Sequence, residues 1–268
     1  MKSRHVRTIA TASRSNLFCL AILLTSAITT ADDPARSIAV YNPQRLMGAA
    51  VSCERVALGE PDDYKPCIAR LPNGELLLTA FHQYKRDGSQ VMEQTLLFRS
   101  KDGGQTWSHA EKLNLLGREP YLTVLPDGTI FITGHLLAQD VRNQWGYTCG
   151  FLHRSIDGGQ SWQSTRIESE SVRPGASNHT TRNVLRLSDG TLLLGVDYDG
   201  GSGPWLMWRS KDNGETRDKT GACEPRDFKS VYGFFGGETW LWQSKSSRIW
   251  ALVRVDSNEM PISDKPIT

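Results

Sequence analysis

Ionisable side chains recur at corresponding places along a repeated sequence. The main ones are Lys65, His82, Arg86, Asp87, Arg118, Glu119, His135, Asp140, His179, Arg182, Asp197, Glu238 and Arg254. Carboxylates can transfer protons or act as nucleophiles, and arginines can hold an anionic group through paired hydrogen bonds. This mixture of acids and bases therefore favours acid–base chemistry or the binding of a charged ligand.

The elements that must position these side chains follow from an eight-residue motif that occurs three times. The copies are Ser100–Trp107, Ser155–Trp162 and Ser210–Arg217. Their aspartates, Asp102, Asp157 and Asp212, lie 55 positions apart. A repeat of this length is typical of propellers, solenoids and arrays.

Each repeat contains short runs of β-forming residues separated by turns. First runs are expected at 66–71, 120–125, 181–187 and 239–243, second runs at 75–82, 129–136, 191–198 and 248–255, and third runs at 95–100, 150–155 and 204–210. The turns between first and second runs are mostly Asn-Gly or Asp-Gly, which tolerate the positive φ angles of tight hairpins. No helical period occurs, so the pattern predicts an all-β propeller, with about three and a half four-stranded blades over residues 61–268.

The strand order separates the two ends of each blade. In an up-and-down sheet, the Asn-Gly turns and the aspartate motifs fall at the same end. The charged residues lie just before first strands or just after second strands, which is the opposite end. We therefore expect a ligand at that end. The motif aspartates are expected to be structural, because such a side chain accepts hydrogen bonds from its own turn.

The three motifs resemble the Asp-box, or BNR repeat, S-x-D-x-G-x-T-W, of sialidase-like propellers. The first copy matches fully, the second has Ser161 for threonine, and the third has Arg217 for tryptophan. The resemblance covers residues 61–268 and implies part of a six-bladed β-propeller. It also implies a sialidase-like glycoside hydrolase acting on sialic acid or other acidic glycans.

Sialidases hold the sugar carboxylate with three arginines and use an aspartate as acid/base with a tyrosine nucleophile activated by a glutamate. The resemblance implies two catalytic residues, Asp87 as acid/base and Glu238 as the glutamate. It implies four substrate-binding residues, Lys65, Arg86, Arg182 and Arg254, with Lys65 where the first arginine usually stands. The tyrosine is expected in a later blade that this sequence does not contain.

These residues also have simpler interpretations. Residues 86–88 can form a solvated turn, Arg182 and Arg254 can be surface cations, and Glu238 can be a loop carboxylate. The histidines His82, His135 and His179 are expected to be structural, and the tryptophans of residues 205–250 to lie in the core. An exported glycoside hydrolase is therefore weighed against a non-catalytic propeller that binds glycans or proteins on the same face.

The N-terminus has the features of a signal peptide. Four basic residues precede the apolar run 17–28, which is too short to cross a bilayer, and small residues follow it. We expect residues 1–31 to be removed, residues 32–60 to form an N-terminal segment, and the protein to be secreted or periplasmic. Without residues 1–31, 27 basic residues face 29 acidic ones, which argues against a nucleic-acid partner.

Four cysteines remain after the signal, namely Cys53, Cys67, Cys149 and Cys223. In an exported protein they can form two disulfides, with three possible connectivities, and the local pair Cys53–Cys67 is favoured. No Cys-x-x-Cys pair occurs, so neither a metal site nor a cofactor is expected.

Overall fold

The computed structural model describes residues 55–168, 174–198, 205–219, 222–223 and 238–253. These residues form strands and turns and contain no helix, which confirms the all-β prediction. Residues 1–31, predicted to be a signal peptide, lie outside the described residues, as do Cys53 and Arg254. The part of the chain that the structure describes also has no helix long and apolar enough to cross a membrane.

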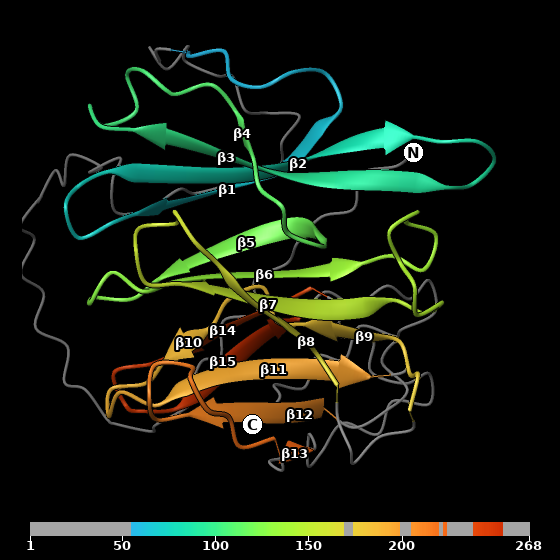
Figure 1. Ribbon diagram of the computed structural model, residues 1–268. Helices are drawn as coiled ribbons and strands as arrows, with labels where there is room; N and C mark the ends of the chain where they lie inside the picture. The colour runs from blue at the N-terminus through green and yellow to red at the C-terminus, as the bar shows by residue number, and fades with distance from the viewer. Residues whose placement is uncertain (1–54, 169–173, 199–204, 220–221, 224–237, 254–268) are drawn as a thin grey trace, which may run out of the picture. The chain divides into compact units, whose positions relative to one another are not determined.

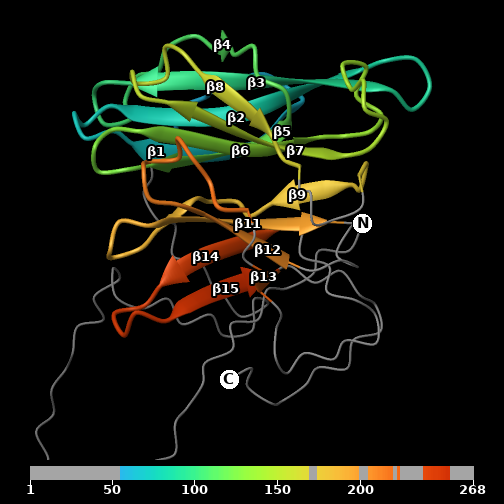
Figure 2. The same ribbon diagram turned by 60° about the horizontal axis from the view of Figure 1, so that its bottom comes forward.

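The strands form four antiparallel sheets in chain order (Figures 1 and 2). The first contains β1 (Asp63–Arg70), β2 (Leu76–Lys85), β3 (Val91–Ser100) and β4 (Glu111–Lys112). The second contains β5 (Arg118–Val124), β6 (Ile130–Leu136), β7 (Cys149–Ser155) and β8 (Gln163–Arg166). The third contains β9 (Asn178–Thr180), β10 (Leu185–Arg186), β11 (Leu192–Tyr198), β12 (Trp205–Ser210) and β13 (Ala222–Cys223), and the fourth β14 (Thr239–Gln243) and β15 (Ile249–Val253).

Three complete sheets and a two-stranded fourth match the expected three and a half blades. One first strand differs from expectation: the run 181–187 is interrupted, and β9 and β10 pair separately with β11.

The core lies between neighbouring sheets. One cluster joins the first two sheets through Leu77, Leu97 and Ile130, and another joins the second and third through Phe131 and Trp208. All five side chains are almost fully buried. Burying each such side chain contributes about 1.5–3 kcal/mol, so packing between blades is a main source of stability.

The three motif aspartates hold their own turns together, as expected. Asp157 accepts hydrogen bonds from the backbone N–H groups of Gln160 and Ser161 at 3.0 and 2.9 Å and from Ser155 Oγ at 2.7 Å. Asp102 and Asp212 accept equivalent bonds. Hydrogen bonds from Thr106 and Thr216 lower the pKa values of Asp102 and Asp212 to about 2, so both are ionised at neutral pH.

An arginine next to the last residue of β3 and another at the same place in β7 each join one blade to the next. Arg99 donates to the carbonyls of Gly158 and Gly159 at 2.9 and 3.3 Å. Arg154 donates to the carbonyl of Asn213 at 2.8 Å. The second and third aspartate turns are therefore held both by their own carboxylates and by the preceding blade.

Replacing Asp157 by alanine should loosen this turn and lower the melting temperature by roughly 5 °C, because several hydrogen bonds are lost together. Thermal unfolding followed by circular dichroism measures the effect. The neighbouring exposed residue supplies the control, since Ile156→Ala changes no turn hydrogen bond. Equal melting temperatures for the two variants would contradict the structural role.

Two sequence expectations concern cysteine and tryptophan side chains. Cys67 has a free thiol, whose Sγ accepts a hydrogen bond from Leu122 N at 3.3 Å, and Cys53, its favoured disulfide partner, lies outside the described residues. Trp208 is buried, but Trp240, Trp242 and Trp250 are exposed, because nothing in the described part of the chain covers that face of β14 and β15.

Candidate functional site

The aspartate turns and the first turns lie at the same end of the sheets, as the sequence predicted. The side chain of Asn213, in the third aspartate turn, donates to Asp127 and Thr129 in the first turn of the second sheet. The opposite end carries the starts of β1, β5 and β14, and the charged residues meet there.

Three repeats carry a charged residue at the same position before the first turn. In each of them, one backbone N–H donates across this turn, that of Leu71, Leu125 or Ser244. The residue six positions earlier is Lys65, Glu119 or Glu238, respectively. Equivalent positions at the starts of first strands point their side chains toward a common region.

Backbone strain helps to aim two of these side chains. Lys65 and Glu119 have positive φ angles of 51° and 55°, at the register shifts of β1 and β5, and both precede a proline. Proline disfavours helical angles in the preceding residue, and strained backbone angles cluster at functional sites. Gly134 makes room for the shift in β5, because a Cβ there would lie 2.9 Å from the carbonyl oxygen of Arg118.

Arg182 reaches the site because residues 182–184, between β9 and β10, do not pair with β11. Its N–H donates to the carbonyl of Thr239 at 2.8 Å, and the side chain of Asn183 donates to the carbonyl of Leu241 at 2.8 Å. These bonds to the fourth sheet interrupt the expected strand and place the guanidinium between the blades.

A threonine on each preceding blade fixes the same region. Thr79 donates to the carbonyl of Pro120 at 2.8 Å, and Thr133 donates to the carbonyl of Arg182 at 2.6 Å. Both threonines are buried. The backbones that carry Glu119 and Arg182 are thus held by hydrogen bonds from a neighbouring sheet.

The four side chains form one network. Lys65 Nζ lies 3.0 Å from Glu238 Oε1 and 3.5 Å from Glu119 Oε1. Arg182 Nη2 lies 2.5 Å from Glu119 Oε2 and also contacts Glu238 Oε1. Two cations therefore bridge the same two carboxylates, and these carboxylates come from different blades.

Solvent reaches the members of this network unequally. The side chains of Glu119 and Arg182 are each 10% exposed, whereas those of Glu238 and Lys65 are 26% and 45% exposed. The guanidinium of Arg182 also lies over the ring of Tyr121, with its Cζ 5.1 Å from the ring centre. Glu119 and Arg182 form the buried floor, and Glu238 and Lys65 face solvent.

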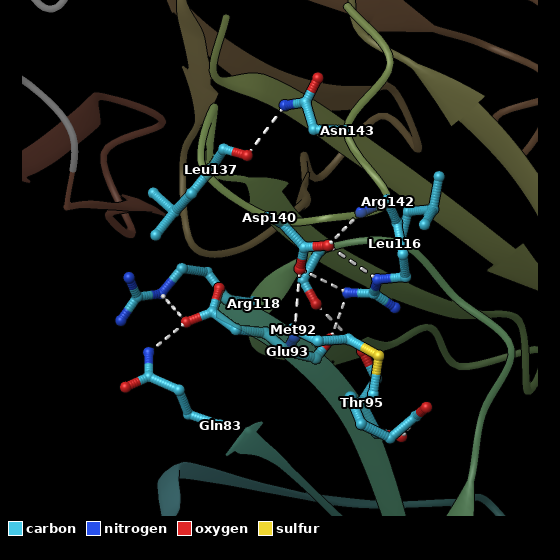
Figure 3. Close-up of polar contacts among 12 residues, drawn as sticks. Gln83, Met92, Glu93, Thr95, Leu116, Arg118, Leu137, Asp140, Arg142 and Asn143 are labelled. Carbon is cyan, nitrogen blue, oxygen red and sulfur yellow. Dashed lines mark hydrogen bonds and ion pairs between the residues drawn. The ribbon is translucent and has the colours of Figure 1, made fainter. Parts of the chain in front are cut away.

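A second charged group adjoins the floor (Figure 3). Arg118 Nη2 lies 3.5 Å from Glu119 Oε1, and its Nε lies 3.4 Å from Oε1 of Glu93, which is fully buried. Gln83 also donates to Glu93 Oε1, at 2.6 Å. Burial raises the pKa of Glu93, against the opposing charge of Arg118.

A loop of the second sheet clamps the backbone of Glu93. Asp140 accepts from the Glu93 N–H at 3.0 Å, and Arg142 donates to both Asp140 and the Glu93 carbonyl. Burial alone would raise the pKa of Asp140, but hydrogen bonds from Arg142 outweigh it and lower that pKa. Asp140 is therefore a structural anion between two blades.

The histidines of this end have structural contacts. His82 Nδ1 lies 2.7 Å from Asp63 Oδ1, which agrees with the expected structural role. His135 and His179 pack edge to face with ring centres 4.8 Å apart. Burial lowers the pKa values of both, which keeps them neutral at pH 7.

The structure brings together three of the six residues that the sequence singled out, namely Lys65, Arg182 and Glu238. Arg86 and Asp87 lie in the exposed turn between β2 and β3 (Figure 1). Lys65 is level with the middle of β2, so a strand rise of about 3.3 Å per residue places this turn roughly 20 Å further along the hairpin. Their catalytic and binding roles remain predictions, as does that of Arg254, outside the described residues.

Sequence reasoning placed Glu119 and Arg118 at the correct end but assigned neither a role. A signal for Glu119 was present, since aligning the repeats on their first turns puts it at the same position as Lys65 and Glu238. Nothing comparable marks Glu93, which reads as an ordinary strand residue.

Comparison with known proteins bears on the fold. No model of a protein family matches the chain, and no curated protein matches its sequence. The GH93 α-L-arabinofuranosidase of Fusarium graminearum in complex with arabinobiose is similar in structure, with TM-score 0.54 and 17% identity over 76% of this chain and 60% of that one. Trypanosoma rangeli sialidase in complex with the inhibitor DANA is similar with TM-score 0.51 and 15% identity over 74% of this chain and 35% of that one.

The chain has a sialidase-like β-propeller fold. Both matched enzymes are longer, and the chain spans 60% of the arabinofuranosidase and 35% of the sialidase. In a propeller, the blades are arranged around a central channel. The charged network of this propeller lies at the starts of its first strands, at the end opposite the aspartate turns.

Within the described residues, no three His, Cys, Asp or Glu side chains gather in a way that could hold a metal ion. A surface hollow beside the first sheet is lined mostly by apolar side chains, among them Leu58, Leu78, Phe98 and Trp107. Its lining also includes Tyr64 and Pro66, the two neighbours of Lys65 in the chain.

Proposed function

We propose that this chain is part of an exported glycoside hydrolase that acts on a glycan carrying a negative charge. The observation that carries the proposal is the pair of carboxylates, Glu119 and Glu238, bridged by Arg182 and Lys65 at the ligand-facing end of the blades. Glycoside hydrolysis commonly uses two such carboxylates on either side of the scissile bond.

The spacing of the pair favours retention of configuration. Oxygens of both carboxylates contact the same nitrogen, Arg182 Nη2, so they lie no more than about 5 Å apart. Retaining enzymes have carboxyl groups roughly 5–5.5 Å apart, whereas inverting enzymes leave about 6.5–9.5 Å for a water molecule.

The two carboxylates differ in a way that fits two roles. Glu119 faces three cations, Lys65, Arg118 and Arg182, which suits a nucleophile that must carry negative charge. Glu238 is the more exposed and can exchange protons with water. Glu119 would attack the anomeric carbon while the glycosidic bond breaks, and the leaving oxygen would take its electron pair and the proton of Glu238.

The second half of the reaction returns both groups to their starting states. Glu238, now a carboxylate, would take a proton from water, and the water oxygen would attack the anomeric carbon. The bond between that carbon and Glu119 would break with its electron pair returning to the carboxylate. The sum of the two steps is hydrolysis, with one water consumed.

The exposed lysine favours an acidic glycan. Lys65 is the most exposed cation of the network, and a carboxylate on the sugar would compete with Glu238 for it. Such competition would release Glu238 to carry a proton. The fold is compatible with glycoside hydrolysis in general, because the similar enzymes are named as an arabinofuranosidase and a sialidase. The basic and apolar N-terminal sequence supports export, which N-terminal sequencing of the mature protein would check.

Hydrolysis of fluorogenic substrates tests the function. Methylumbelliferyl glycosides of sialic acid, glucuronic acid and L-arabinofuranose are compared with the full-length protein, and an acidic sugar is expected to be preferred. Glu119→Gln and Glu238→Gln should each lower kcat/KM by about 10²–10⁴-fold, because each removes a reacting carboxylate. The exposed Glu111→Gln variant serves as the matched control.

The same assay tests the role that the sequence assigned to Asp87. If Asp87→Asn abolishes turnover while Glu119→Gln does not, the carboxylate pair is wrong but the hydrolase stands. Absence of turnover on every glycoside by the folded wild-type protein would overturn the hydrolase.

A non-catalytic glycan-binding propeller is the second candidate. It is favoured by the engagement of Arg182 with two carboxylates, which leaves its planar fork less available to a substrate. This function predicts saturable glycan binding without turnover, weakened by Lys65→Ala and unaffected by Asp87→Asn.

A further inference from the structure

Glu93 is a fully buried carboxyl group that contacts Arg118 (Figure 3). Arg118 in turn contacts Glu119 of the proposed site. The Oε1 of Glu93 accepts a hydrogen bond from Gln83 at 2.6 Å and lies 3.4 Å from Arg118 Nε. Its Oε2 is buried and has no hydrogen-bond partner among the described residues. A buried ionised carboxylate normally has all its oxygens paired, because an unpaired buried charge is costly.

Glu93 and Glu119 share Arg118 at nearly equal distances, 3.4 Å to its Nε and 3.5 Å to its Nη2. Arg118 Nε makes no hydrogen bond, although it is buried and faces Glu93 Oε1. The unpaired Oε2 therefore fits a neutral carboxyl group better than an anion, because an ionised oxygen loses more when it is buried without a partner.

Charges on every side disfavour a second anion at this position. Arg118 and Glu119 face Glu93 from β5, Gln83 faces it from β2, and Asp140 and Arg142 hold its backbone from the loop after β6. Asp140 is already paired with Arg142, and Glu119 already shares Arg118. Burial and these two anions raise the pKa of Glu93 against the opposing effects of Arg118 and Gln83.

We infer that Glu93 is a positioning residue that stays protonated at neutral pH and thereby leaves the charge of Arg118 to Glu119. This inference rests on the proposed function, since Glu119 is the nucleophile there. Arg118 is stacked on Phe81, with its Cζ 5.1 Å from the ring centre, so it can shift only slightly between its two partners. Ionisation of Glu93 would draw Arg118 toward Glu93 and weaken its contact with Glu119.

The charge state of Glu93 can be measured without any substrate. Infrared difference spectra of the full-length protein should show the band of a protonated carboxyl group at pH 7, and Glu93→Gln should remove it. The folded protein keeps this proton above the ordinary pKa of glutamate, so wild-type stability should fall as pH rises from that value through the raised pKa. Glu93→Gln should lose this decline in urea unfolding, whereas the exposed control Glu111→Gln should keep it.

The positioning role is tested by the pH dependence of hydrolysis. The assay uses the methylumbelliferyl glycoside that is hydrolysed fastest. As the pH is raised, kcat/KM of the wild-type protein should fall by tenfold or more, which gives the pH profile an alkaline limb. Glu93→Gln should shift this limb to another pH or remove it. Glu93→Ala, which also releases Gln83 and Arg118, should lower kcat at all pH values. A structural role alone would change stability and leave the limb in place.

The outcomes separate this inference from the hydrolase itself. Absence of the protonated-carboxyl band at pH 7 overturns the inference, whatever the activity. An unchanged alkaline limb in Glu93→Gln, with the band present in the wild type, also overturns the positioning role and leaves the hydrolase intact. If no glycoside is hydrolysed, the hydrolase and the positioning role fall, while the infrared and unfolding results still decide the charge state.

Discussion

Replacing Arg182 by glutamine should destabilise the protein by about 3–5 kcal/mol and lower any glycoside hydrolysis by at least about 10²-fold. Arg182 contacts both Glu119 and Glu238, and the side chains of Arg182 and Glu119 are each only 10% exposed. Removing one partner of a buried ion pair leaves the other charge uncompensated, which costs about that much. Urea unfolding and the fluorogenic assay measure the two effects.

Two further variants give this prediction its controls. Arg186→Gln removes an exposed arginine of the same sheet and should change stability by less than about 0.5 kcal/mol. Arg182→Lys should lie in between, because one ammonium group cannot reproduce the planar fork that serves two carboxylates. A loss below about 1 kcal/mol in Arg182→Gln would contradict the role of this arginine as the centre of the network.

Acid should destabilise the protein by about 3 kcal/mol through His153 alone. This histidine is buried in β7, where its Nε2 donates to the carbonyl of Leu116 at 2.9 Å and its Nδ1 accepts from Ser164 Oγ at 2.8 Å. Burial lowers its pKa to about 4. The unfolded chain binds a proton below about pH 6.5, so stability is lost as pH falls from there to about 4, at about 1.36 kcal/mol per unit.

The variant His153→Gln separates this effect from the rest of the protein. Glutamine can keep a donor and an acceptor for the same partners but does not titrate. The free energy of unfolding in urea should therefore fall less in this variant than in the wild type between pH 7 and pH 4. The difference between the two decreases should be about 3 kcal/mol. The exposed His109→Gln variant should follow the wild type, and parallel curves for His153→Gln would contradict the prediction.

The sequence predicts those parts of the fold that depend on neighbouring residues. The aspartate turns are local, since Asp102 bonds only within residues 100–106, and a local pattern specifies them. The strand runs and their order follow from apolar periodicity and turn residues in the same way. The interruption between β9 and β10 does not, because it arises from hydrogen bonds of Arg182 and Asn183 to the fourth sheet.

The site shows the same limit more clearly. Lys65, Arg182 and Glu238 could be selected as charged residues at the correct end of the blades. Their meeting depends on the register shifts at Lys65 and Glu119 and on the packing of blades that are distant in sequence. Glu93 could not be selected, because its burial follows from the clamp of Asp140 and Arg142 rather than from its own neighbours.

The aspartate turns also join neighbouring blades in both directions. Arg99 supports carbonyls of the second blade and Arg154 supports one of the third, while Asn213 of the third aspartate turn donates back to Asp127 and Thr129 of the second blade. Repeat proteins gain much of their stability from nearest-neighbour terms. Loss of one of these arginines should therefore weaken the coupling between the two blades that it joins, so that each can open without the other.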